Sequence, residues 1–97
     1  MQTVWKYAID KPGTINIEMP FGAEPFSVGF QGDTFVMWAL VEVNDLPLAP
    51  ARMFCLFGTG HSAPTGRALR PIGSATHPDT GSGLFPNGTV WHLFEVL

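Results

Sequence analysis

The residues best suited to chemistry form one short turn, Gly58-Thr59-Gly60-His61, directly after the apolar run Met53–Phe57. The threonine hydroxyl and the histidine imidazole both form hydrogen bonds, and the glycines allow backbone conformations that other residues avoid. Successive backbone N–H groups in such a turn can surround an anion. We therefore predict that residues 58–61 contact a small anionic ligand. The alternative is a structural turn that His61 fixes by a hydrogen bond to a backbone carbonyl.

Two arginines follow this turn on a loop with little other charge. The guanidinium groups of Arg67 and Arg70 are suited to two-pronged hydrogen bonding with phosphate or carboxylate. If the loop folds back, both would add positive charge beside His61. The sequence thus predicts that Arg67 and Arg70 complete the ligand-binding set. The alternative is that two solvated side chains keep a weakly charged surface soluble.

Patterns typical of enzymes and of metal sites are missing. The turn lacks the Gly-Lys-Ser/Thr ending of the phosphate-binding loop in nucleotide hydrolases. His61, His77 and His92, with Asp79 as a fourth candidate ligand, are spaced by 16 and 15 residues. Structural zinc sites use much closer pairs. We predict no catalytic residue, no metal and no cofactor; a hydrolase is the alternative, because a histidine and a threonine share a loop.

The charge balance restricts the possible partners. A net charge of −3 with five Lys and Arg residues argues against binding of duplex nucleic acid. Charged residues make up 13% of the chain, about half the usual share. Part of the surface is therefore expected to be buried in a homo-oligomer. No signal segment is apparent and no apolar run approaches the roughly 18 residues of a membrane span, so we expect no membrane association.

Short strands are the elements that must position these residues. No window has the helical period of 3.6, and the nine prolines work against helices. Strand-like patterns occupy residues 3–9, 14–19, 26–30, 34–43, 53–57, 69–75 and 89–97. The connections are too short for crossover helices, which favours antiparallel pairing. We predict that residues 1–97 form a single all-β domain, a small, mainly antiparallel sandwich or barrel of about six or seven short strands.

Finer features of the sheets can also be predicted. Residues 34–43 and 53–57 are apolar on both faces, so both should be central strands, with Cys55 in the core. The turn at residues 10–13 should join the first two strands into a hairpin. Alternation places Phe26 on one face with Val28 and Phe30. The three tryptophans are expected in the core or at a subunit interface.

Four separated motifs resemble a family of small tailed-phage proteins classed as a domain of unknown function. They are Val4-Trp5-Lys6-Tyr7, Met37-Trp38-Ala39-Leu40-Val41, Phe57-Gly58-Thr59-Gly60-His61 and Val90-Trp91-His92-Leu93-Phe94-Glu95. The similarity covers almost the whole length, and Gly-Thr-Gly-His is its most specific motif. Residues 76–86 are longer than the link often found there in such sequences. The resemblance implies a phage-encoded protein in the host bacterial cytoplasm and assigns no activity.

Two classes of function are compatible with these features. Some phage proteins of this size are sponges that sequester cyclic nucleotide or ADP-ribose signals of host defence. By that analogy, the leading hypothesis is a non-enzymatic protein that binds a small phosphorylated ligand near His61. The alternative is a structural or protein-binding module, either a virion component or an inhibitor of a host protein. The two differ in one requirement, because only a ligand pocket needs Arg67 and Arg70 beside His61.

Overall fold

Seven strands and no helix occur in the computed structural model, which describes residues 1–44, 50–78 and 88–97. The strands are β1 (Gln2–Ile9), β2 (Gly13–Ile17), β3 (Glu24–Gln31), β4 (Thr34–Glu42), β5 (Arg52–Gly58), β6 (Leu69–Thr76) and β7 (Val90–Val96). Every pairing between them is antiparallel. The all-β, antiparallel prediction is confirmed. Within these residues there is no helix that could cross a membrane.

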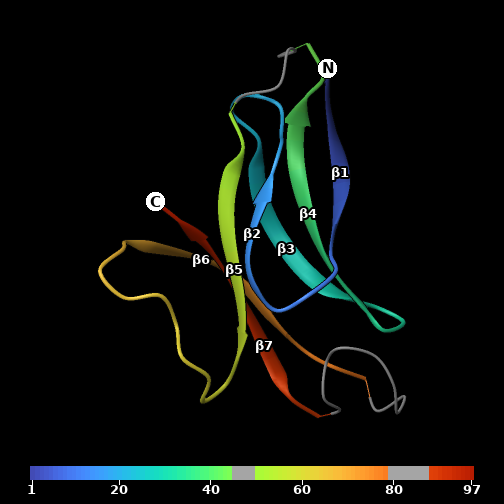
Figure 1. Ribbon diagram of the computed structural model, residues 1–97. Coiled ribbons are helices and arrows are strands. Elements are labelled where there is room, and N and C mark those ends of the chain that lie inside the picture. The colour runs from blue at the N-terminus through green and yellow to red at the C-terminus, as the bar shows by residue number, and fades with distance from the viewer. Residues whose placement is uncertain (45–49, 79–87) are drawn as a thin grey trace.

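The strands form two sheets (Figure 1). Sheet A has the order β1-β4-β3, and sheet B has the order β2-β5-β7-β6. The inner faces of the two sheets share one core, to which sheet A contributes Phe35 and Met37 and sheet B contributes Phe54 and Leu93. Both strands predicted to be central, β4 and β5, have a partner on each side. The fold is therefore sandwich-like.

The predicted hairpin between the first two strands does not form. β1 pairs with β4, whereas β2 pairs with β5, so residues 10–12 carry the chain from sheet A to sheet B. A turn was correctly predicted at residues 10–13, where Gly13 has a φ of 100°. A turn does not decide pairing, however. Each half-exposed strand pairs instead with a central strand that is apolar on both faces.

Bulges interrupt β3 and β6. The register of β3 against β4 shifts between Pro25 and Ser27. This shift removes Phe26 from the face that it was predicted to share with Val28 and Phe30, and leaves it 56% exposed. The register of β6 against β7 shifts between Pro71 and Gly73. A Cβ atom at Gly73 would lie 2.8 Å from Cγ2 of Val28, so β3 and β6 approach closely where the sheets meet.

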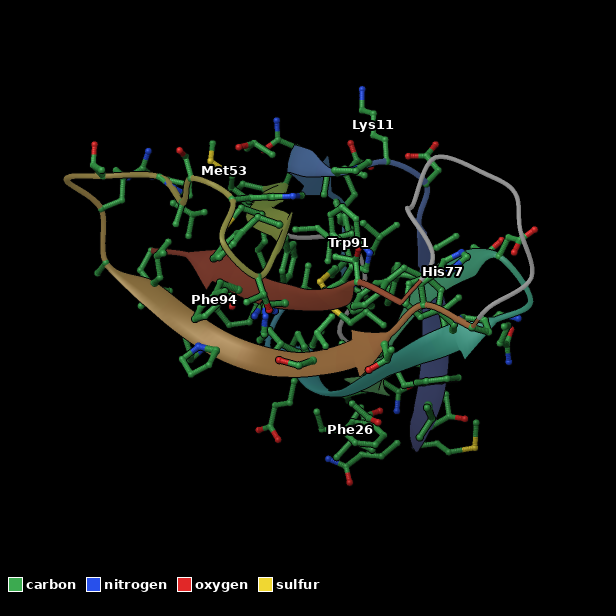
Figure 2. All side chains as sticks on the ribbon, turned by 90° about the horizontal axis from the view of Figure 1, so that it is seen from below. Lys11, Phe26, Met53, His77, Trp91 and Phe94 are labelled. Atoms are coloured by element: carbon green, nitrogen blue, oxygen red, sulfur yellow. The ribbon has the colours of Figure 1, made fainter. Side chains whose placement is uncertain are left out.

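Residue register separates an inner from an outer face in each sheet. Trp91 is 1% exposed on the inner face of sheet B and lies at the centre of the molecule in Figure 2, with Phe26 at its periphery. Cys55 pairs with Phe94 on the outer face of sheet B. It is nevertheless 2% exposed. The prediction of a buried thiol is confirmed, and the register places Cys55 on the face of β5 opposite to that of Phe54 and Leu56.

Candidate functional site

The Gly58–His61 turn uses its backbone N–H groups within the protein. The Thr59 N–H donates to the carbonyl of Val90 at 3.0 Å, and the His61 N–H donates to the carbonyl of Gly58 at 2.9 Å. The Gly58 N–H donates to Nδ1 of His61 at 3.2 Å. Gly60 has a φ of 86°, which a glycine adopts without strain. Three of the four N–H groups that an anion would need are therefore engaged in holding the turn.

The His61 imidazole packs against a buried residue of the core, Trp91. Its ring packs edge-to-face on Trp91, with centroids 5.5 Å apart and planes at 76°. A Cβ atom at Gly58 would lie 2.9 Å from Cε1 of His61, so this position can carry no side chain unless the histidine moves. The imidazole accepts a hydrogen bond from a backbone N–H, whereas the structural alternative had it bonded to a carbonyl. This geometry is that of a structural turn.

We expect the substitution His61→Ala to lower the free energy of unfolding by about 1 kcal/mol, the size of one lost hydrogen bond. The packing on Trp91 can raise this cost somewhat. Thermal and urea unfolding measure the effect. Thr65→Ala, at an exposed position of the same loop, is a control that should change stability little. An unchanged stability in His61→Ala would contradict a structural role for the imidazole.

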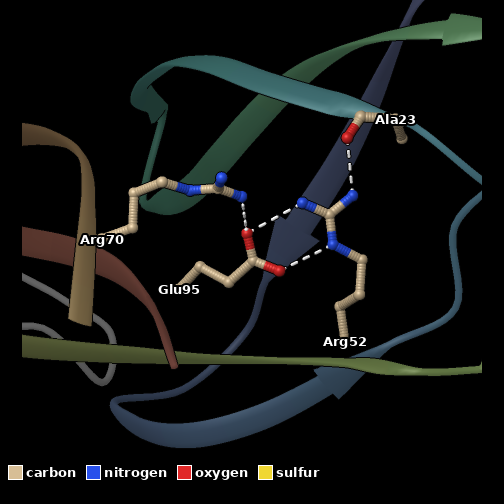
Figure 3. Close-up of polar contacts among 4 residues, drawn as sticks. All are labelled: Ala23, Arg52, Arg70 and Glu95. Carbon is tan, nitrogen blue, oxygen red and sulfur yellow. Dashed lines mark hydrogen bonds and ion pairs between the residues drawn. The ribbon is translucent and has the colours of Figure 1, made fainter. Parts of the chain in front are cut away.

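Arg70 lies in a second cluster, built around Glu95 (Figure 3). Both oxygens of the Glu95 carboxylate accept from Arg52: Nε donates to Oε2 at 2.6 Å and Nη2 donates to Oε1 at 2.8 Å. Arg52 Nη1 also donates to the carbonyl of Ala23 at 2.6 Å. Arg70 forms an ion pair with Oε1 of the same carboxylate. Arg52 thereby ties sheet B to the segment that enters β3.

The three ionised groups differ in their exposure to solvent. The side chain of Glu95 is 6% exposed and that of Arg52 is 20% exposed, whereas that of Arg70 is 52% exposed. Hydrogen bonds from Arg52 hold the pKa of Glu95 below its usual range, against the effect of burial. The same hydrogen bonds raise the pKa of Arg52. Glu95 is therefore a buried carboxylate whose ionised form is stabilised by Arg52.

The structure divides the predicted ligand-binding set between the two ends of sheet B. Gly58 is paired with Trp91, whereas Arg70 is paired with Glu95, four residues farther along β7. At the rise of a β-strand this separation is roughly 13 Å. Ala68 accepts a hydrogen bond from the Leu97 N–H, which places the adjacent Arg67 at the Arg70 end. Neither arginine lies beside His61.

A hydrogen-bonded histidine, His92, which the sequence marked only as a candidate metal ligand, lies on the outer face of sheet B. Oγ1 of Thr59 is 2.7 Å from Nε2 of His92, and Oγ of Ser74 is 2.7 Å from Nδ1 of the same ring. The Thr59 hydroxyl also donates to the carbonyl of Val90, at a longer 3.5 Å. A neutral ring that satisfies all three contacts donates from Nε2 to Thr59 and accepts at Nδ1 from Ser74.

This arrangement can in principle activate a hydroxyl group. Ser74 is within the distance at which a histidine acts as general base toward a nucleophile. A hydroxyl, Thr59, occupies the second nitrogen, where serine hydrolases place a carboxylate. The same bonds also have a simpler effect, which is to hold His92 in one orientation.

The three histidines that were candidate metal ligands do not lie together: His61 is in the turn, and Nε2 of His77 lies 3.6 Å from Asp33. Asp79 lies outside the described residues.

Aromatic rings continue the outer face of sheet B next to His92. The rings of Phe57 and Phe94 stack with centroids 5.3 Å apart and planes at 7°, and Phe57 is 6.2 Å from the His92 ring. Register places these outer-face residues on one side: Thr14, Asn16, Met53, Cys55, Phe57, Leu69, Pro71, Ser74, Thr76, Val90, His92, Phe94 and Val96. None of these described residues is Asp, Glu, Lys or Arg.

One protein family model, described as "Domain of unknown function (DUF7352)", matches residues 1–97 of the chain. The chain belongs to this family. No curated protein and no solved structure shows significant similarity to it. In this DUF7352 chain the four sequence motifs lie on two pairs of neighbouring strands. Trp5 of β1 is opposite Ala39 of β4, and Gly58 of β5 is opposite Trp91 of β7.

Proposed function

We propose that this protein is a non-enzymatic binding module that docks another protein through the outer face of sheet B. The observation that carries the proposal is the composition of that face, which joins stacked phenylalanines, aliphatic side chains and hydroxyls without a charged residue in the described strands. The cores of protein interfaces are depleted of charge and enriched in aromatic residues and methionine. Phe57 and Phe94 are half-buried on this face, and apolar patches that a small domain leaves partly exposed are a feature of interaction sites.

The side chains of this face are held in place before any partner binds. Phe57 and Phe94 fix each other by stacking. Thr59 and Ser74 hold the two nitrogens of His92. Such a surface loses little conformational entropy on association. The partner that it fits is a protein surface with apolar or aromatic side chains beside hydrogen-bonding groups. A phosphate-rich partner does not fit, because the described residues of this face include no Lys or Arg.

The biological setting forms the second part of the proposal. The similarity of the four motifs to small tailed-phage proteins supports a phage-encoded protein in the host bacterial cytoplasm. In that setting a docking module acts as an inhibitor of a host protein, including a defence protein, or as a virion component. The position of the arginines favours this class over a nucleotide sponge, since Arg70 is engaged with Glu95 and not with the turn.

Site-specific photo-crosslinking in a bacterial lysate tests the docking face. With the crosslinking group at Thr76, on the outer face of sheet B, we expect one bacterial protein to be captured, and the same group at exposed Gln31 of sheet A should not capture it. Phe94→Lys should abolish capture, because it places a charge on the face. Phe26→Lys, at an exposed phenylalanine of β3, is the matched control. Equal capture at both positions, or capture that survives Phe94→Lys, would refute the proposal.

A small-anion ligand is the second candidate, and one observation favours it. Arg67 is exposed and forms no hydrogen bond or ion pair with any described residue, so its guanidinium is available. Melting measurements with cyclic dinucleotides, ADP-ribose derivatives and polyphosphates test this class, because a bound ligand raises the melting temperature. A rise that Arg67→Ala removes would make the anion hypothesis the leading one.

A hydrolase is the remaining alternative, and labelling of Ser74 by a fluorophosphonate would indicate it.

A further inference from the structure

The four edge strands of the two sheets are protected unequally against pairing with another chain. β3 and β6 each contain a proline and a bulge, and β2 has only five residues. Prolines, bulges and short length are the usual protections of an edge strand. β1 has eight residues, no proline and an uninterrupted register against β4. Figure 1 shows it at the outside of sheet A, flanked by β4 alone among the described strands.

The backbone groups that β1 presents at this edge follow from its register. The Val43 N–H donates to the carbonyl of Met1 at 3.0 Å, one step beyond the Gln2–Glu42 pair. Hydrogen-bonded and non-hydrogen-bonded pairs alternate along an antiparallel ladder. The odd-numbered residues of β1 therefore bond to β4. The N–H and C=O groups of the even-numbered residues, Gln2, Val4, Lys6 and Ala8, point away from the sheet.

We propose that β1 pairs antiparallel with β1 of a second copy of this chain, about a two-fold axis that passes beside Trp5. In this register Val4 faces Lys6 of the second copy and Gln2 faces Ala8. All four outward-facing residues of each strand then exchange hydrogen bonds. The two three-stranded sheets A become one continuous six-stranded sheet. This inference does not depend on the proposed docking function, which uses the outer face of sheet B.

Other registers of the same two strands either leave an outward-facing residue without a hydrogen-bonding partner or place like charges opposite each other. An axis beside Val4 leaves Ala8 without an opposite residue. An axis beside Lys6 places two ammonium groups directly opposite each other, which is unfavourable. The axis beside Trp5 also makes Trp5 a non-hydrogen-bonded pair with its own copy, the kind of pair in which side chains approach most closely. Two aromatic rings at such a position pack against each other.

Exposure and charge identify a second copy as the occupant of this edge. Val4 is 48% exposed and Trp5 is 37% exposed, and self-pairing covers both. Lys6 is the only charged residue of the strand, and its side chain is already bonded to Gln31 at 2.7 Å. In the proposed register Lys6 therefore faces Val4 of the second copy, and the two Lys6 residues are diagonal to each other and not directly opposite. Val4 and its neighbour Leu40 on the outer face would also join the equivalent pair of the second copy.

Light scattering and edge variants test the dimer. We expect a mass of about 21 kDa at micromolar concentration, twice the 10.5 kDa of the chain. Val4→Pro removes an outward N–H and spares the bonds to β4, so it should give a monomer. Trp5→Lys should do the same by placing like charges at the axis. Phe21→Lys, at a 70% exposed phenylalanine outside the strands, is the control and should remain dimeric. A monomeric native protein, or a dimer that survives both edge variants, would overturn the proposal.

Cysteine crosslinking tests the register separately from the mass. Trp5→Cys should form an intermolecular disulfide on mild oxidation, because opposed residues of a non-hydrogen-bonded pair are close enough for one. Val4→Cys should not, since it lies diagonal to its own copy, at about 7 to 8 Å. The native Cys55 is 2% exposed and should not react. Crosslinking at position 4 in place of position 5 would overturn the proposed axis.

Discussion

Replacement of Glu95 by alanine is expected to lower the free energy of unfolding by about 3 to 5 kcal/mol, the usual cost of removing one partner from a buried ion pair. The reason is the position of Arg52. Its guanidinium donates to both oxygens of Glu95 and its side chain is only 20% exposed, so without the carboxylate its charge is largely buried and has lost its anionic partner. A domain of this length has roughly 5 to 15 kcal/mol of stability in total. Urea unfolding measures the difference.

Arg70→Ala is the matched control for Glu95→Ala. Arg70 contacts the same carboxylate, but its side chain is 52% exposed, so its loss should cost less than about 1 kcal/mol. Arg52→Ala should cost nearly as much as Glu95→Ala, since it leaves a buried carboxylate. A double-mutant cycle of Arg52 and Glu95 separates their coupling from the other contacts. Equal costs for the two arginines would show that burial does not decide the effect.

The pH dependence of stability provides a second test of the Glu95 cluster. Arg52 holds the pKa of Glu95 in the folded protein below its usual range, whereas in the unfolded chain it is about 4.3. As the pH falls, the unfolded state therefore binds the proton first. The stabilisation is fully present above the unfolded pKa and is lost as the pH falls toward the folded one. The difference between the native protein and Glu95→Ala should be constant near neutral pH and should shrink below about pH 4.

The positions of the strands could be predicted from the sequence because alternation and turn residues are local signals. Thr34–Glu42 and Arg52–Gly58 were evident as central strands, since both of their faces are apolar. The pairing of β1 and β2 was not predictable in the same way. It is decided by competition between strands that lie far apart in the sequence. A local turn between β1 and β2 therefore predicted a hairpin that does not form.

Of the two polar clusters, one feature could be predicted from local alternation, whereas the other depends on the pairing of distant strands. Alternation along β7 places Glu95 on the inner face with Trp91 and Leu93, so an inward carboxylate could have been predicted. The contact of Ser74 with His92 could not. It requires the bulge between Pro71 and Gly73, which shifts the parity of β6 and turns Ser74 to the outer face. Pro71 and Gly73 are residue types that occur at bulges, but they do not fix the residue at which the register shifts.

The substitution Trp91→Ala is expected to destabilise the protein by about 3 to 5 kcal/mol, the range for loss of a large buried aromatic side chain. Trp91 is 1% exposed. Its cross-strand neighbours on the inner face are small: Gly58 on β5 and Ala75 on β6. Neither has a side chain long enough to move into the vacated space. The cavity should therefore persist, and the cost should lie toward the upper end of the range.

The consequence should extend to the Gly58–His61 turn. His61 packs edge-to-face on Trp91, so the alanine variant removes the surface that supports the imidazole. Amide hydrogen exchange of Thr59, which donates to Val90, should become faster relative to the rest of β5. Trp38→Ala is the matched control. Trp38 is half-buried on the outer face of sheet A, where its ring lies over Gly29, and its loss should cost about 1 to 2 kcal/mol. If the two tryptophan variants were equally destabilised, or if exchange of Thr59 were unchanged, Trp91 would not be the residue that joins the core to the turn.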